Sequence, residues 1–293
     1  MTSQSLVCQL NSKQSHAKYP FVLLLQLSPQ EYFDQLLEDR GYNVPLIESI
    51  NSAYFNDPTE LQIASYGRKM QVAVRKGDVT ALEKLLKCGL SPNACNRFGE
   101  SILFLACRRG KTEILQALIE ARAAIQICDD HGRNLLHASC WAINPPFEIV
   151  KILLEYDSSM LFMMDTRGLT PLSYINIEDW GKWNDWLHEN IDTFFPIDKA
   201  ATYRESAVAT MCPNMVPLPK KSPLIELEMI EMLANGRVSA DEVLGMIEEK
   251  CIAGMVASSE SDDGGYFDGD SSTEFGSDEE SSIFGPMEDK IFD

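Results

Sequence analysis

The stretch CNRFGESILFLAC, residues 95–107, has the same layout as CDDHGRNLLHASC, residues 128–140, which lies 33 positions further along the chain. Each stretch begins and ends with cysteine, has glycine at its fifth position and continues into a short apolar segment. The same offset relates Ala73 to Ala106, Gly77 to Gly110, and Leu85 to Leu118. A fixed period of this length indicates a repeat architecture, in which each unit buries its apolar face by stacking on its neighbours.

Each unit consists of a glycine turn followed by two helical patterns. The turn glycines are Gly99, Gly132 and Gly168, and the step from Gly132 to Gly168 is 36 residues, which indicates an insertion around residues 143–146. A second helix in each unit carries apolar residues at helical spacing, as in Leu82, Leu85 and Leu86. We therefore expect an all-α solenoid of about four units with short β-turn fingers.

The repeated residues resemble the ankyrin-repeat family. Residues 132–139, GRNLLHAS, are close to the family pattern G-x-T-P-L-H-x-A, and residues 168–173, GLTPLS, are a second copy. Residues 110–115, GKTEIL, resemble the family's turn between helices, and residues 87–93, KCGLSPN, resemble its G-A-x-x-N exit. The resemblance covers about residues 67–188 and implies that partners contact the finger tips and the inner helices.

The chain departs from the family pattern at both ends of this region. Residues 68–71, RKMQ, replace T-P-L-H, so we expect the first unit to be a cap. The fourth unit has Trp180, Trp183 and Trp186 in place of leucine pairs, which form either a recognition face or the apolar face of a degenerate terminal unit. The opening LSPQEYFDQLL, residues 27–37, also resembles ankyrin families that are expanded in diatom algae.

Capping patterns predict helices outside the repeats. Residues 28–31, SPQE, and residues 57–60, DPTE, are two helix starts, which we expect to cover the open N-terminal end of the stack. Residues 224–233 carry an apolar stripe before Gly236, and residues 239–242, SADE, begin another helix. This hairpin either docks on the repeats or serves oligomerisation. The predicted segments are a disordered leader (1–27), an N-terminal helical cap (28–66), the repeats (67–195), a linker (196–222), the helical hairpin (223–253) and a disordered acidic tail (254–293).

Charge and cysteine content limit the kind of protein. The formal charge is −19, and the residues from Ala257 onward contribute −11 through twelve acidic side chains and one lysine. Such a chain is a poor partner for nucleic-acid phosphate. It has no apolar run of about 18 residues, so we expect no membrane span.

None of the eight cysteines forms a C-x-x-C pair, so we expect free thiols and an intracellular location, cytoplasmic or nuclear. The acid-poor leader is either disordered or a transit peptide.

Patterns typical of catalytic or metal sites have simpler explanations here. Gly110-Lys111-Thr112 lacks the glycine that a phosphate loop needs five positions earlier, where Leu105 stands. Cys128, His131, His137 and Cys140 have zinc-like spacing, but Cys95 and Cys107 hold the same repeat positions without histidine. We expect His131 at a finger tip and His137 hydrogen-bonded to the backbone. The sequence predicts no catalytic residue, metal site, cofactor or small-molecule substrate.

The ankyrin resemblance, carried over position by position, implies a partner-binding face. Its residues are Arg97, Phe98, Glu100, Arg108, Arg109, Asp130, His131, Arg133, Trp141 and Arg167. We expect this face to be locally basic, so that the acidic tail folds back on it and competes with an acidic partner. The alternative is a solvated, arginine-bearing surface. Ser259, Ser271 and Ser277 each have an acidic residue three positions later and are candidate phosphorylation sites.

Two functions fit the sequence. The first is a non-enzymatic adaptor that binds a protein partner on the concave face of the repeats, with a regulatory tail. The second is a transcriptional co-regulator whose tail recruits nuclear machinery, because aromatic residues interrupt its acidic runs. A third hypothesis, an enzyme with an embedded repeat module, has no support because the sequence contains no catalytic motif.

Overall fold

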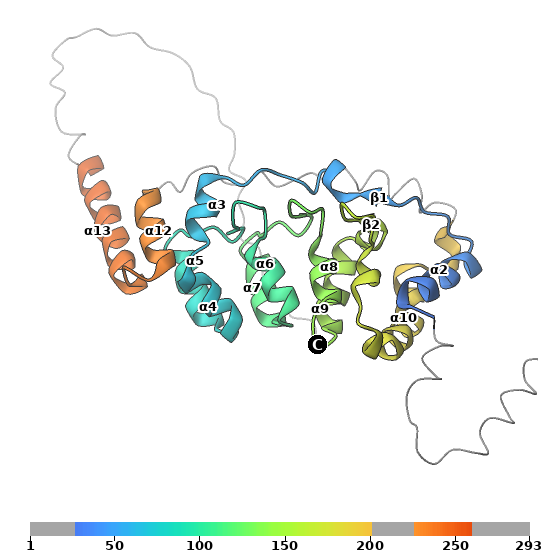
Figure 1. Ribbon diagram of the computed structural model, residues 1–293. Coiled ribbons are helices and arrows are strands. Elements are labelled where there is room, and N and C mark those ends of the chain that lie inside the picture. The colour runs from blue at the N-terminus through green and yellow to red at the C-terminus, as the bar shows by residue number, and fades with distance from the viewer. Residues whose placement is uncertain (1–26, 201–225, 260–293) are drawn as a thin grey trace, which may run out of the picture. The chain divides into compact units, whose positions relative to one another are not determined.

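The computed structural model describes residues 27–200 and 226–259, and its repeats are pairs of short antiparallel helices. The first pair is α4 (Arg68–Lys76) and α5 (Val79–Lys87), the second α6 (Ile102–Arg108) and α7 (Thr112–Glu120), and the third α8 (Leu135–Cys140) and α9 (Phe147–Tyr156) (Figure 1). Inner helices α4, α6 and α8 contact one another in order, as do outer helices α5, α7 and α9. The fold is thus the mostly helical ankyrin solenoid that the period predicts.

The fourth unit is irregular because its inner helix is only one 3-10 turn. It comprises η3 (Ser158–Phe162), β2 (Met163–Met164), η4 (Pro171–Tyr174), η5 (Ile177–Asp179) and α10 (Trp180–Phe194), and η6 (Ile197–Lys199) follows. Trp183 is buried and packs edge-on against Phe147 of α9, with ring centroids 5.1 Å apart. Trp186 stacks on the same ring at 5.5 Å. The tryptophan stripe therefore supplies core contacts.

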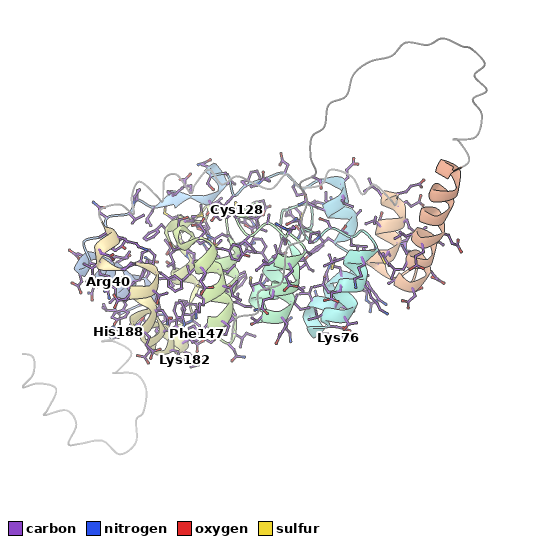
Figure 2. The ribbon with its side chains drawn as sticks, turned by 180° about the vertical axis from the view of Figure 1, so that it is seen from behind. Arg40, Lys76, Cys128, Phe147, Lys182 and His188 are labelled. Atoms are coloured by element: carbon purple, nitrogen blue, oxygen red, sulfur yellow. The ribbon has the colours of Figure 1, made fainter. Side chains whose placement is uncertain are left out.

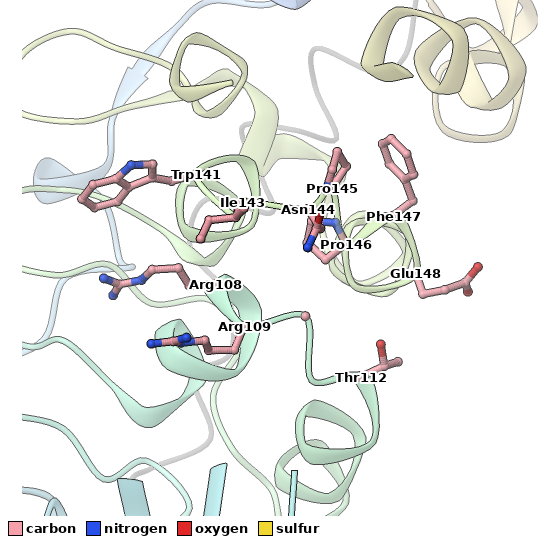
Figure 3. Close-up of a pocket in the computed structure, with 11 residues that line it drawn as sticks. Arg108, Arg109, Thr112, Trp141, Ile143, Asn144, Pro145, Pro146, Phe147 and Glu148 are labelled. Carbon is pink, nitrogen blue, oxygen red and sulfur yellow. The ribbon is translucent and has the colours of Figure 1, made fainter. Parts of the chain in front are cut away.

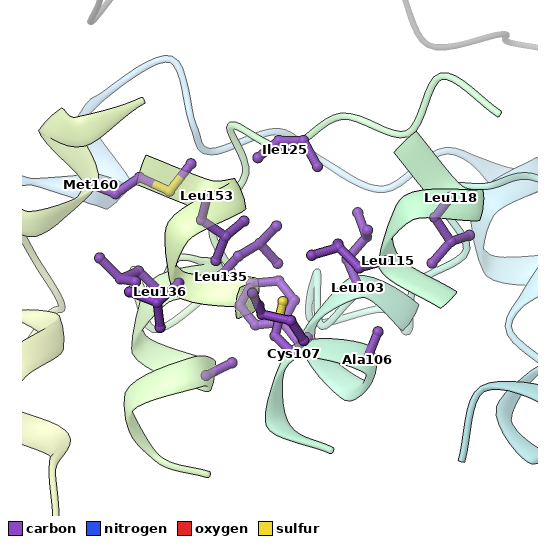
Figure 4. Close-up of a cluster of buried hydrophobic side chains, with 14 of the residues drawn as sticks. Leu103, Ala106, Cys107, Leu115, Leu118, Ile125, Leu135, Leu136, Leu153 and Met160 are labelled. Carbon is purple, nitrogen blue, oxygen red and sulfur yellow. The ribbon is translucent and has the colours of Figure 1, made fainter. Parts of the chain in front are cut away.

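A continuous apolar core runs between the helix layers. Figure 4 shows Leu103 and Cys107 of α6 facing Leu135 and Leu136 of α8. All four side chains have zero exposure. Burial of a leucine side chain stabilises a fold by about 1.5–3 kcal/mol, so these contacts hold neighbouring units together. Small residues such as Ala106, which is also fully buried, let the helices approach closely.

Helix α2 (Pro29–Asp39) begins at Ser28, whose side chain forms the predicted capping box with Glu31. We expected residues 28–66 to cover the N-terminal end of the stack. Helix α2 instead packs on α10 and η4 at the opposite end. Phe33 lies between Phe162 and Phe195, with centroid distances of 5.8 and 5.5 Å. Figure 2 shows Arg40 and His188 together at this end, and Lys76 lies toward the other. The expected location of helix α2 is therefore wrong, because a capping box determines where a helix starts and not the surface on which it packs.

Residues 40–59, which we call the strap, return the chain from this end to the start of the stack. They run along the finger side and contain β1 (Ile47–Glu48), which pairs in parallel with β2, and η2 (Ser49–Asn51). The backbone N–H of Cys128 donates to the Tyr54 carbonyl at 2.9 Å, and that of Cys95 donates to the Gln62 carbonyl at 3.2 Å. Gln62 and Tyr54 are eight residues apart, and their partners Cys95 and Cys128 are one repeat of 33 residues apart. Eight residues of this segment therefore span one repeat.

The C-terminal hairpin closes the N-terminal end of the stack. Helix α12 (Leu227–Asn235) contacts α4 and α3 (Glu60–Ser65), and its side chains Ile230, Leu233 and Ala234 are buried. Gly67 lies against Ala234 so closely that a Cβ at residue 67 would be 2.3 Å from the Ala234 carbonyl carbon. This contact supports docking of the hairpin on the repeats as its function.

Helix α13 (Ala240–Ser259) extends six residues into the segment that we expected to be a disordered tail from residue 254. The helix continues through Gly254, and residues 255–259 contain no proline to end it. The predicted leader except for Leu27, the rest of the tail and most of the predicted linker lie outside the described residues. No helix among the described residues is both long and apolar enough to span a bilayer.

Candidate functional site

The three fingers have one geometry, set by a side-chain oxygen at the same repeat position. The Oδ1 atoms of Asn96, Asp129 and Asp165 each accept hydrogen bonds from two backbone N–H groups, two and four residues further on, at 2.8–3.0 Å. Between these donors lie Gly99, Gly132 and Gly168, all with positive φ near 75°. Asparagine and aspartate stabilise such turns because they bond their own backbone. Each finger tip is therefore held rigidly.

Neighbouring fingers are bonded to each other through the backbone. The Asp130 N–H donates to the Phe98 carbonyl at 3.0 Å, and the Thr166 N–H donates to the His131 carbonyl at 2.9 Å. Phe98, Asp130 and His131, all predicted as partner-binding residues, thus lie side by side at the tips. All three side chains are exposed, and Phe98 keeps 57% of its surface in water. The fingers present one continuous edge.

Three of the five predicted arginines have carboxylate partners. Arg133 pairs with buried Asp129 at 2.5 Å, Arg167 pairs with Asp165 at 3.1 Å, and Arg108 pairs with Glu100. Arg97 and Arg109 are exposed and have no ion pair within the part of the chain that the structure describes. The face is therefore less basic than we expected, since the fingers carry their own counter-charges.

Aromatic rings connect the inner helices of the third and fourth units. The Arg108 guanidinium lies 5.5 Å over the Trp141 ring, and that ring is 6.3 Å from Tyr174. The Arg167 guanidinium lies 5.4 Å from the centroid of the Tyr174 ring. Cation–π contacts of this kind keep long side chains in fixed positions. The predicted residues Arg108, Trp141 and Arg167 form one cluster through Tyr174.

Tyr174 was not among the predicted residues, although the repeat register offered a signal. It occupies in the fourth unit the position that Leu105 and Ala138 occupy in the second and third. Its hydroxyl donates to Asp165 Oδ2 at 2.6 Å and accepts from Arg167 at 2.7 Å. Burial alone would raise the pKa of Asp165, but bonds from Tyr174, Leu169 and Arg167 lower it overall. The carboxylate is therefore held charged at the base of the third finger.

His137 has the role that we predicted for it. Its Nδ1 accepts from the Asn134 N–H at 3.1 Å, completing a capping box at the start of α8, and its Nε2 is 3.1 Å from the Leu169 carbonyl. Burial lowers the pKa of His137 to about 4, so the ring is neutral near pH 7. His131, by contrast, is exposed on the finger. The two histidines of the zinc-like spacing therefore lie in different environments.

The described cysteine side chains pack as apolar groups. Cys88, Cys95, Cys107, Cys128 and Cys140 are free and buried. Burial raises the pKa of the Cys95, Cys107 and Cys128 thiols to about 12, which leaves them protonated and poor nucleophiles. Of the predicted phosphorylation sites, Ser259 is the last residue of α13, and Ser271 and Ser277 lie outside the described residues.

Comparison with known families agrees with this geometry. Residues 70–175 match the family model described as ankyrin repeats (3 copies). The match includes all ten predicted partner-binding residues and Tyr174, and it stops before α10. The further resemblance of residues 27–37 to the families of diatom algae stays a prediction. The paired helices, the bonded fingers and this match together identify residues 70–175 of the chain as ankyrin repeats.

Proposed function

We propose that the chain is a non-enzymatic scaffold that binds a protein partner on its fingers and inner helices. Ankyrin repeats in general are protein–protein interaction modules. The observation that carries the proposal is the exposure of Phe98 and Trp141, at 57% and 53%, although a backbone hydrogen bond fixes Phe98 and a cation–π contact fixes Trp141. Rigid, exposed aromatic residues bind partners well because they lose little conformational entropy and bury a large area. The partner, the adaptor role and an intracellular location are parts of this proposal.

The test compares two double variants of the full chain. Phe98→Ala with Trp141→Ala removes the exposed aromatic residues of the proposed face, and Tyr156→Ala with Ile177→Ala removes similarly exposed side chains elsewhere. Affinity capture from cell extract, quantified by mass spectrometry, is expected to lose specific proteins only with the first variant. Equal losses with both variants, or none with either, would contradict the proposal. Circular dichroism confirms that all variants keep the native helix content.

A co-regulator function rests on the composition of the tail alone. Residues 257–293 carry a charge of −11 with interspersed phenylalanine and tyrosine, the composition of disordered activation segments. Fusion of these residues to a heterologous DNA-binding domain is expected to activate a reporter gene. An inactive fusion, expressed at the level of an active control fusion, would leave the adaptor as the better proposal.

A further inference from the structure

A groove separates the turn between α6 and α7 from the turn between α8 and α9. Its volume is about 880 Å³, and Figure 3 shows Arg108, Arg109 and Thr112 on one side and the segment from Trp141 to Glu148 on the other. The second side contains the insertion that lengthens the third repeat from 33 to 36 residues. A wall of this groove therefore belongs to the third repeat and has no counterpart in the second repeat.

The insertion exposes an apolar side chain that the fold does not need. Ile143 has 89% of its surface in water, the largest value among the exposed large apolar residues that the structure describes. Trp141, 53% exposed, stands beside it, and half-buried Pro145, Pro146 and Phe147 continue the apolar wall. Two consecutive prolines keep this wall stiff, because each has a fixed φ. An apolar side chain of a partner would find a preformed surface here.

The charge of the groove favours an acidic occupant. Arg109 is exposed at its edge and has no carboxylate partner among residues 27–200 and 226–259. Arg108 already contacts Glu100 and the Trp141 ring, so its guanidinium is fixed in place. The lining contains one acidic residue, Glu148, which lies beside Thr112 at the far end from Arg109. A carboxylate entering near Arg109 therefore meets a free guanidinium.

We propose that this groove binds an acidic segment of a partner protein, with an apolar anchor residue on Ile143 and Trp141 and a neighbouring carboxylate on Arg109. The proposal deepens the proposed function, because it rests on protein binding by the repeats and names the class of partner. A second copy of the chain is a weaker occupant, since two chains of formal charge −19 repel each other.

The experiment selects twelve-residue peptides from a random phage-displayed library on the immobilised full chain. The groove variants are Ile143→Ser and Arg109→Glu. Their matched controls are Ile177→Ser, which replaces an isoleucine with 47% exposure, and Lys151→Glu, which reverses an exposed charge on α9. All four side chains are exposed, so the variants are expected to fold, and equal melting temperatures verify this. Selected peptides are then synthesised and their Kd is measured by fluorescence polarisation.

We expect selected peptides to contain Asp or Glu within two residues of an aromatic or aliphatic residue. Each groove variant should weaken their binding by about tenfold or more, and the controls should not. Sedimentation velocity of the full chain and of Ile143→Ser tests for a second copy in the groove. Three results would overturn the proposal: no enrichment of such peptides, equal binding to groove variants and controls, or a dimer of the full chain that Ile143→Ser dissociates. A single Phe98→Ala variant separates this proposal from the proposed function: peptides that lose binding to Phe98→Ala but not to Ile143→Ser would overturn only the groove and leave the proposed function standing.

Discussion

The hydroxyl of Tyr54 donates a hydrogen bond to the carboxylate of Asp157, so the strap is bonded to the end of the third repeat, 103 residues later in the chain. Both side chains are buried, with 0% and 5% exposure. Gln126 and Ser159 also donate to this carboxylate, at 2.7 and 2.5 Å. Burial and the charge of Asp157 raise the pKa of Tyr54, so its hydroxyl is protonated and able to donate at neutral pH.

Tyr54→Phe is expected to lower the free energy of unfolding by about 1–2 kcal/mol, because Asp157 loses one buried donor and keeps the others. Urea denaturation measures the change. Tyr156→Phe, at a side chain with 55% exposure, is the control and should change stability by less than about 0.5 kcal/mol. Equal effects of the two substitutions would mean that the strap is not fixed by this bond.

Gly67→Ala is expected to displace α12 from the first repeat, because the new Cβ would lie 2.3 Å from the Ala234 carbonyl carbon. The clash is steric only, since Gly67 has φ −101°. We expect a loss of about 1–3 kcal/mol and faster hydrogen exchange at amides of α12. Gly245→Ala in α13 is the control, because no heavy atom lies within 4 Å of its added Cβ. Unchanged exchange in α12 would contradict the hairpin contact.

His137 is expected to lower the stability of the fold as the pH drops from about 6.5 to about 4. Its pKa is about 4 in the native state, against roughly 6.5 in an unfolded chain. Between these values the unfolded state binds more protons, so stability is full above about pH 6.5 and falls by up to about 3 kcal/mol as the pH drops to 4. His137→Gln keeps an acceptor at the same capping position and does not titrate. Its unfolding free energy should depend less on pH in this window, and parallel curves would contradict the assignment.

Asp165→Asn is expected to destabilise the third finger by about 2–3 kcal/mol, because an amide group cannot accept the bonds from both Tyr174 and Arg167 that the carboxylate accepts. The pKa of Asp165 is lowered in the native state, so the carboxylate stabilises the fold above its unfolded value near 3.9, and this contribution is lost as the pH falls through the native value. Thermal unfolding at pH 7 measures the effect. Exposed Asp130→Asn is the control, and a comparable loss there would contradict the role of the bonds.

The repeats could be predicted because their signals are local. Gly77, with φ 76°, ends α4 in the left-handed conformation, and the same glycine recurs 33 residues later in the next unit. His137 was also predictable, since the family pattern places it three residues after the helix start. These features depend on backbone conformation within a few residues.

The ends of the stack could not be predicted because they depend on packing between distant segments. Phe33 reads as one apolar residue of an amphipathic helix, and nothing near it in sequence distinguishes Phe162 and Phe195 from α12 as its partners. The prediction of a basic binding face failed for a similar reason. Glu100, Asp129 and Asp165 neutralise Arg108, Arg133 and Arg167 through side-chain geometry, which a count of arginines does not contain.

The bonding of the strap to the fingers has a consequence for how this protein can evolve. Repeat proteins commonly gain or lose whole units by duplication and deletion, because each unit contacts only its neighbours. Here one further unit would move α10 away from the first repeat by about 10 Å, the usual spacing of packed helices. Helix α2 could follow only if the strap lengthened too, by about the eight residues that separate Gln62 from Tyr54. A change in repeat number therefore needs two coordinated changes in the gene, one that adds or removes a unit and one that changes the length of the strap to match.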